Sequence, residues 1–151
     1  MPLHIVLYQP EIPANSGNIA RLSAATKTHL HLVRPLGYSL ADRYLKRAGL
    51  DYWPHVKLTI HDSLQEVMDS LSGSRFFYAS TKADILYTKV GYMEDDAFVF
   101  GPESRGLPEE LIKNNPSTAI KIPMEGPVRS LNLSTAVGVV IYEALRQIKG
   151  Y

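Results

Sequence analysis

The chain has 151 residues, of which 45% are hydrophobic and 21% charged, and its formal net charge is +1. This composition excludes a disordered or collagen-like chain, and the length suits one domain, so we expect residues 1–151 to form a single domain. Cysteine is absent, no apolar run reaches the roughly 18 residues of a membrane span, and the first residues do not form a secretion signal, so we expect a cytoplasmic protein without disulfides or thiolate chemistry.

Short apolar runs alternate with helical patterns along the chain. Several of the runs are almost continuously apolar, which is typical of strands covered on both faces of a sheet. The predicted strands are Leu3–Tyr8, Leu30–Val33, Val56–Ile60, Phe76–Ala79, Ala97–Phe100 and Ala119–Ile122. The predicted helices lie near Gly17–Thr26, Asp42–Leu50, Ser63–Leu71, Pro108–Asn114 and Asn132–Lys149. This alternation predicts an α/β fold with a mainly parallel sheet flanked by helices.

The segment after the first predicted strand is rich in polar groups. Two prolines stiffen it, Asn15 can cap the following helix, and Gly17 permits a tight entry. Those roles leave Glu11, Asn18 and Arg21 unexplained, and Asn18 and Arg21 are three residues apart, on one helix face. Because ligands of parallel sheets bind beyond the carboxyl ends of the strands, we expect this corner to be functional.

A second corner follows the strand that ends at Phe100. Gly101 and Gly106 suggest a backbone that approaches something closely, although a plain turn before the helix at Pro108 is an equal alternative. Leu-Pro follows Gly106, so this is no Walker loop, and the chain has no G-x-G-x-x-G dinucleotide motif.

A third corner precedes the last predicted helix. Ser130, Asn132 and Ser134 alternate with leucines there, which is more polar groups than one helix cap requires. The helix itself is apolar on more than one face, and this pattern leaves a deep core helix and a subunit interface as open alternatives.

Other polar clusters have simpler interpretations. His29 and His31 share a strand face, but no carboxylate or third histidine accompanies them in the sequence, so we interpret them as ordinary core or surface residues. Glu94–Asp96 is interpreted as a solvated turn. A basic cluster suits a solvated helix face or phosphate contacts, and it comprises Arg34, Arg43, Lys46 and Arg47.

Together, the three corners resemble the signature motifs of SPOUT-class RNA methyltransferases, and most closely the small YibK/TrmL-like family. The resemblance extends over nearly the whole chain. It is carried by Asn15-x-Gly-Asn-Ile-x-Arg21, Arg47-Ala-Gly-Leu-Asp-Tyr52, Phe100-Gly-Pro-Glu-Ser-Arg-Gly-Leu-Pro108 and Arg129-Ser-Leu-Asn-Leu-Ser134.

This resemblance implies an α/β knot with a trefoil knot in its C-terminal part, acting as a homodimer on tRNA. The implied reaction is 2′-O-methylation of the wobble nucleotide, cytidine or modified uridine 34, of leucine tRNAs, with S-adenosylmethionine as cofactor and no metal. The implied cofactor-binding residues are Ala79, Thr81, Gly101, Glu103, Gly106, Ile122, Met124, Ser130 and Leu131.

The resemblance also assigns roles to polar residues of the three corners. The implied catalytic residues are Arg21, Asn18, Ser130 and Asn132. The implied substrate-binding residues are Glu11, Asn15, Arg43, Arg47, Arg129 and Tyr142. Because a guanidinium does not normally release its proton, Arg21 suits stabilisation of alkoxide charge or a grip on phosphate better than the role of a base. Other RNA substrates such as rRNA, a flavodoxin-like carrier and a non-catalytic RNA-binding module remain alternatives.

Overall fold

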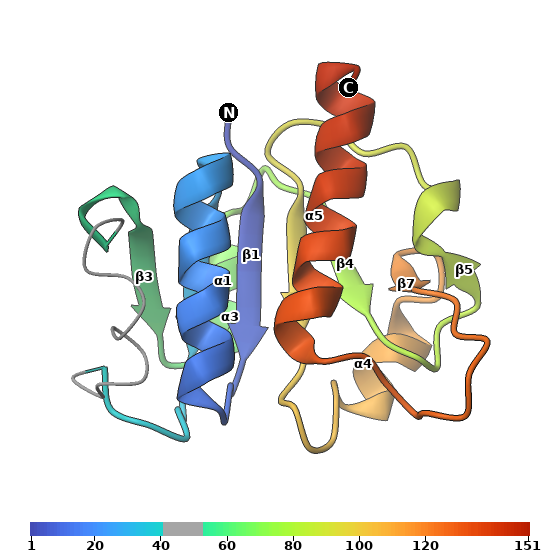
Figure 1. Ribbon diagram of the computed structural model, residues 1–151, viewed down its shortest axis with the longest axis horizontal. Coiled ribbons are helices and arrows are strands. Elements are labelled where there is room, and N and C mark those ends of the chain that lie inside the picture. The colour runs from blue at the N-terminus through green and yellow to red at the C-terminus, as the bar shows by residue number, and fades with distance from the viewer. Residues whose placement is uncertain (41–52) are drawn as a thin grey trace.

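The computed structural model describes residues 1–40 and 53–151. Within these residues, parallel strands form one seven-stranded sheet in the order β3-β2-β1-β6-β4-β7-β5 (Figure 1). The strands are β1 (His4–Tyr8), β2 (His29–Val33), β3 (Lys57–His61), β4 (Phe76–Ala79), β5 (Ile85–Leu86), β6 (Ala97–Phe100) and β7 (Ala119–Lys121). The helices are α1 (Pro13–Thr26), α3 (Leu64–Ser70), α4 (Glu109–Asn114) and α5 (Leu133–Lys149), with short 3₁₀ helices η1 (Trp53–His55) and η2 (Tyr87–Lys89). None of these described helices has the length and apolarity needed to cross a membrane.

The sheet is covered on both faces, as the continuous apolar strands predict. Ile5 and Leu7 belong to the core beneath α1 and α5, whereas Val6 belongs to a second core with residues of α3 and α4. This alternation follows from the two-residue period of a strand. Figure 1 shows α1 and α5 side by side in front of the sheet, with α3 and α4 behind it. The α/β prediction is therefore confirmed.

The pairing of β7 shows that an earlier connection crosses the end of this strand. Ala79 of β4 and Ile85 of β5 both pair with Ile120, from opposite sides of β7. The connection 80–84 therefore crosses from one side of β7 to the other. An earlier connection that crosses the end of a later strand in this way is one feature of the expected trefoil knot.

Most predicted elements are found within a few residues of their expected bounds. The strand β5 was not predicted, because two residues do not make a recognisable apolar run. The helix predicted at Asp42–Leu50 lies outside the described residues. The first helix begins at Pro13, four residues before its predicted start at Gly17, because proline is well suited to the first helical position.

The helix caps divide into correct and wrong predictions. Asn132 caps α5, since its side-chain oxygen accepts hydrogen bonds from the amides of Ser134 and Thr135. Asn15 is not a cap: it lies inside α1, whose N-cap is Ile12 and has no side-chain cap of its own. The role of Asn15 is therefore in tertiary contacts.

The interpretation of Glu94–Asp96 as a solvated turn is wrong, whereas His29 and His31 are buried, in agreement with their interpretation as core residues. Asp96 is buried and accepts hydrogen bonds from Arg75 at 2.8 and 2.6 Å, so Glu94–Asp96 is not a solvated turn. His29 and His31 do have a third histidine beside them, because β1 places His4 on the same face of the sheet. Both clusters depend on strand pairing that the sequence alone does not reveal.

The packing of α5 against the sheet leads to a stability prediction. Ile141 is fully buried, and replacing it with alanine leaves a cavity that the surrounding core fills only in part. We expect Ile141→Ala to lower the free energy of unfolding by about 2–5 kcal/mol, measured by urea denaturation at one protein concentration. Val128→Ala is the control, because Val128 is 61% exposed and its loss is expected to stay within about 0.5 kcal/mol. Equal losses in the two variants would contradict this packing.

Candidate active site

The three polar corners meet at the carboxyl edge of the sheet and enclose one cavity. The cavity has a volume of about 580 Å³ and is bounded by the first turns of α1 and α5 and by the ends of β4, β6 and β7. Volumes of this size are typical of small-molecule sites. The cavity is therefore the candidate active site.

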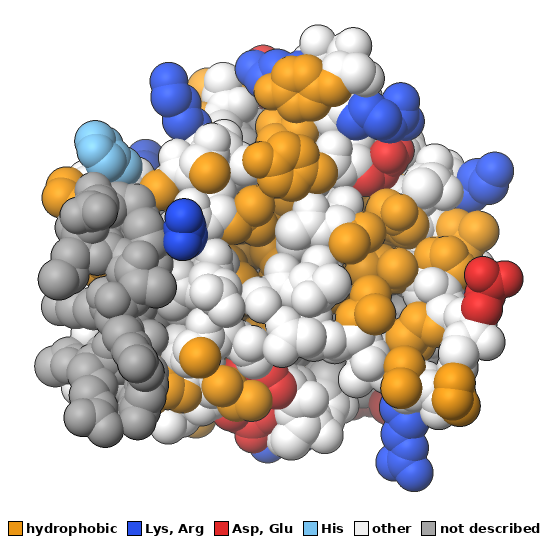
Figure 2. All heavy atoms as spheres, viewed as in Figure 1, with side chains coloured by type: hydrophobic (Ala, Val, Ile, Leu, Met, Phe, Trp, Pro, Cys, Tyr) orange, Lys and Arg blue, Asp and Glu red, His pale blue; other side chains and the backbone are white. Residues whose placement is uncertain are grey.

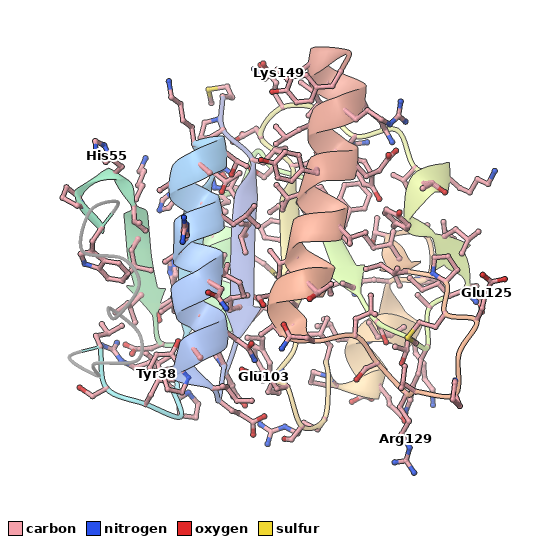
Figure 3. The ribbon with its side chains drawn as sticks, in the orientation of Figure 1. Tyr38, His55, Glu103, Glu125, Arg129 and Lys149 are labelled. Atoms are coloured by element: carbon pink, nitrogen blue, oxygen red, sulfur yellow. The ribbon has the colours of Figure 1, made fainter. Side chains whose placement is uncertain are left out.

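The first two corners are joined by reciprocal hydrogen bonds between their glutamates. The carboxylate of Glu103 accepts from the backbone amides of Glu11 at 2.8 Å and Ile12 at 2.9 Å. The carboxylate of Glu11 accepts in return from the amide of Ser104 at 2.8 Å and its hydroxyl at 2.9 Å. These two bonds, led by the amide, lower the pKa of Glu11 below its usual range. Glu103 thus supplies from a distance the acceptors that the start of α1 lacks locally (Figure 3).

The third corner is joined to the other two through a pair of asparagines. The side-chain nitrogen of Asn15 donates to Glu103 at 3.2 Å, and its oxygen accepts from the side-chain nitrogen of Asn132 at 3.0 Å. The oxygen of Asn132 caps α5 at the same time. One continuous set of hydrogen bonds therefore fixes the starts of both front helices relative to the second corner.

The segment after β2 packs against the first corner and holds it by hydrogen bonds. The amide of Gly37 donates to the carbonyl of Pro10 at 2.9 Å, and a side chain at position 37 would overlap the backbone of Glu11. Tyr38 donates to the hydroxyl of Ser16 on α1, and burial raises the pKa of this tyrosine to about 12. Tyr38 is therefore protonated at neutral pH and acts as a fixed donor.

The glycines of the second corner have separate structural reasons. A Cβ on Gly101 would overlap the backbone of Gly106 and Leu107, so the turn closes on itself only with glycine there. Gly106 has a φ of +69°, in the left-handed region that favours glycine. The close backbone approach predicted from the two glycines is thus partly a contact within the loop, between Gly101 and the backbone of Gly106.

Every residue predicted to bind the cofactor lies on the wall of the cavity. The lining includes all nine of them: Ala79, Thr81, Gly101, Glu103, Gly106, Ile122, Met124, Ser130 and Leu131. Asn132 also lines it, as do Asn15 and Arg129 from the predicted substrate-binding set. Arg129 points away from the ribbon at this end of the molecule (Figure 3). Glu11 contacts the second corner just outside the wall.

Other predicted site residues lie elsewhere. Asn18 and Arg21 lie on the exposed side of α1, and neither lines the cavity of the same chain. Tyr142 is 50% exposed, about 15 Å along α5 from Asn132, and it lines a separate cavity of about 440 Å³ near the C-terminal ends of α1 and α5. Arg43 and Arg47 lie outside the described residues.

Sequence reasoning missed part of the wall. Lys82 and Tyr87 line the cavity from the segment around β5, and Lys82 forms an ion pair with Glu109. Arg105 donates to Gln9 at 2.6 Å and adds a second link between the first two corners. The missing signal was β5, because without that strand nothing in the sequence places residues 82–90 beside the cavity.

Comparisons with known proteins agree with this geometry. Residues 2–142 match the model of the SpoU rRNA Methylase family. The tRNA (cytidine(34)-2′-O)-methyltransferase of Methylovorus glucosotrophus is 50% identical, with 95% of this chain and 94% of the relative covered. The Escherichia coli protein of the same name is 45% identical, with 99% and 95% covered.

Solved structures give the same result for the fold. The structure described as "Structural insights into the 2-OH methylation of C/U34 on tRNA" superimposes with a TM-score of 0.93 at 55% identity, covering 99% of this chain and 97% of the other. The AdoMet complex of the SpoU methyltransferase AviRb from Streptomyces viridochromogenes has a TM-score of 0.85 at 22% identity, covering 97% and 57%. At that identity the second likeness concerns the fold alone, and the expected α/β knot class is confirmed.

The crowding at Gly101 leads to a prediction about the second corner. We expect Gly101→Ala to lower the thermal stability, because the added methyl group displaces backbone rather than a flexible side chain; overpacking typically costs about 1–3 kcal/mol. Calorimetry measures this change. Gly126→Ala is the matched control in the third corner, where nothing lies within 4 Å of an added Cβ. An unchanged melting temperature for Gly101→Ala would contradict the closed turn.

Proposed function

The chain belongs to the SpoU rRNA Methylase family, and from this premise we propose that it methylates the ribose 2′-hydroxyl of the wobble nucleotide of tRNA, with S-adenosylmethionine as the methyl donor. The wobble nucleotide is position 34, a cytidine or a modified uridine, and leucine tRNAs are the proposed substrates. The observation that carries the proposal is the single cavity enclosed by the three corners. Because tRNA is the proposed substrate, we also propose that the protein is cytoplasmic.

The cavity fits the proposed cofactor in size and character. Ile122, Leu131 and Val140 give it apolar walls for a flat base, and the neighbouring backbone of the loops offers hydrogen-bonding groups. The carboxylate of Glu103 is already occupied by two backbone amides and Asn15, so we assign it to shaping the wall rather than to binding the cofactor amine. When bound, S-adenosylmethionine supplies a methyl group activated by a sulfonium.

The chain's own residues must align the hydroxyl and accommodate the charge that develops on it. Alignment of two reactants alone gives a large acceleration in a displacement of this kind. We assign Arg21 to stabilising the negative charge on the ribose oxygen, because a fixed cation in a desolvated site acts most strongly where charge develops. Asn18 lies beside Arg21 and is assigned to orienting the ribose. Ser130 and Asn132 line the cavity and are assigned to the same site from that side.

We further propose that the enzyme acts as a homodimer and that Arg21 acts in the site of the partner. Arg21 is about 9 Å further along α1 than Asn15, on the exposed side, whereas the cavity lies at the first turn. Hydrophobic side chains gather between the upper parts of α1 and α5 (Figure 2). Tyr142 of α5 is a half-exposed hydrophobic residue. A second copy packed on this face would bring its own α1 toward the cavity.

The RNA-binding surface is expected to be assembled from both copies. The net charge of +1 is too small for one chain to attract RNA strongly by itself. A dimer carries two copies of Arg34 and Arg129, which are both exposed. It also carries two copies of the predicted basic residues outside the described part of the chain. Phosphate contacts of this kind make binding weaken as salt rises.

Methyl transfer to defined RNAs tests the function directly. The purified protein is incubated with labelled S-adenosylmethionine and leucine tRNA transcripts that carry cytidine 34, and the label is mapped by nuclease digestion. We expect label on the 2′-oxygen of nucleotide 34 and none on a transcript whose residue 34 already carries a 2′-O-methyl group.

Two outcomes would reject this assignment. Transfer to ribosomal RNA fragments but not to tRNA would show a different substrate within the same chemistry. Absence of transfer to every RNA, in protein that still binds S-adenosylmethionine, would favour a non-catalytic RNA-binding module.

Mixed dimers test the role of Arg21. We expect Arg21→Ala to lower kcat by about 100-fold or more while S-adenosylmethionine affinity stays unchanged, because Arg21 is assigned to the charge on the ribose oxygen and not to the cofactor. A second variant, Ala79→Phe, fills the cavity wall and blocks the donor. Refolded together in equal amounts, the two inactive chains should regain roughly a quarter of wild-type activity, since about half the dimers are mixed and each has one intact site.

The matched control replaces Ala79→Phe by the double variant Arg21→Ala/Ala79→Phe. That mixture has no Arg21 to supply, so its activity should stay at the level of Arg21→Ala alone. If the first mixture regains no more activity than this control, Arg21 does not act across a subunit interface.

A further inference from the structure

Four of the five histidines of the chain gather on one face of the sheet, away from the cavity. His4 is on β1, His29 and His31 are on β2, and His61 is on β3, and all four are buried. They occupy the face that carries Val6 and Val33, beneath α3. The cavity lies among β4, β6 and β7, so the two sites use opposite halves of the sheet.

Three of these histidines bring one ring nitrogen each close together. One ligating atom from each of His4, His29 and His31 lies within 4.8 Å of the other two. Nδ1 of His4 and Nε2 of His31 are 3.1 Å apart. Two nitrogens bound to one tetrahedral ion at about 2.0–2.1 Å lie at a similar separation. Only small side-chain shifts would then bring all three rings onto one ion.

The outer nitrogen of each ring has a partner that fixes its orientation. Nε2 of His4 contacts a carboxylate oxygen of Asp95 at 2.8 Å, and Nε2 of His29 contacts the hydroxyl of Thr59 at 2.7 Å. Nδ1 of His31 contacts Nε2 of His61 at 3.0 Å. Metal-binding histidines characteristically use the second nitrogen in this way, most often with a carboxylate.

The protonation of the rings is compatible with metal binding. Burial, followed by nearby positive groups, lowers the pKa of His29 to about 4 and that of His31 to about 2. Both rings are therefore neutral at physiological pH, which is the ligating form. Binding through Nε2 of His31 requires its proton on Nδ1, where it can be donated to His61. A change of tautomer within the cluster is thus sufficient to prepare His31 for metal binding.

We propose that His4, His29 and His31 form a binding site for one divalent transition-metal ion, with zinc as the preferred ion. Imidazole ligands suit zinc, and three of them leave a fourth position for a solvent molecule. Asp95 beside His4 and Glu66 beside His61 contribute negative charge, whereas Lys57 opposes the site with positive charge. The ion would tie β1 to β2 and has a structural role, since the methyl-transfer cavity lies elsewhere.

Zinc binding by the untagged, chelator-treated protein tests the proposal. Equilibrium dialysis followed by elemental analysis should give one zinc per chain for the wild type. We expect His31→Gln and His29→Gln to lose this saturable binding, and Asp95→Asn to weaken it by about 10- to 100-fold. Cobalt(II) should give the strong visible absorption of a tetrahedral site in the wild type but not in His31→Gln or His29→Gln.

His55→Gln is the matched control, because His55 is exposed on η1 and is the one histidine outside the cluster. It should bind zinc as the wild type does. Circular dichroism checks that each variant is folded; if His31→Gln is not, His29→Gln decides, because His29 lies at the rim of the cluster with 9% exposure. Absence of saturable binding by the wild type, or undiminished binding by His29→Gln, would overturn the proposal.

Discussion

The side-chain amide of Asn15 is the link on which the arrangement of the cavity depends. Its nitrogen donates to Glu103 and its oxygen accepts from Asn132, so one residue of α1 contacts both of the other corners. Those corners lie beyond the ends of the strands, where no sheet pairing can hold them. An aspartate at position 15 would lack the donor, and an apolar residue would lack both groups, leaving polar partners unsatisfied. The two glutamates then fix the first two corners to each other through backbone amides, which are rigid partners.

The crossing at β7 explains why these corners surround one cavity. In an ordinary open sheet, successive loops spread along the edge and define a shallow crevice. Here residues 80–84 pass across the end of β7, so the chain that leaves β7 must run beside them before it reaches α5. Three segments that are distant in sequence thereby wrap the same space. The glycine at position 101 lets the second corner close tightly enough to complete the wall.

The sequence was sufficient for the parts of this structure that depend on local patterns. The continuous apolar segments Ala97–Phe100 and Phe76–Ala79 are strands at the predicted bounds, and one of the three polar residues before the last helix, Asn132, is its cap. It was insufficient wherever the partner is distant. Asn15 was predicted as a cap because nothing in the sequence shows that Glu103, 88 residues later, supplies the acceptors. The knot and the residue roles came from the family resemblance, since no periodicity encodes threading.

The two front helices have different tasks, although they pack side by side. The first turn of each is fixed by the hydrogen bonds around Asn15, so both belong to the cavity. Beyond that turn their outer faces differ in character: α5 exposes the aromatic side chain of Tyr142, whereas α1 keeps the polar Asn18 and Arg21 on its exposed side. A helix is stiff over this length, and its start cannot move without moving its exposed side. The same contacts that shape the cavity of one chain therefore also set the position of Arg21 at the surface. In a symmetric dimer this couples the two sites, because the cavity of one copy and the arginine offered to its partner are held by a single helix.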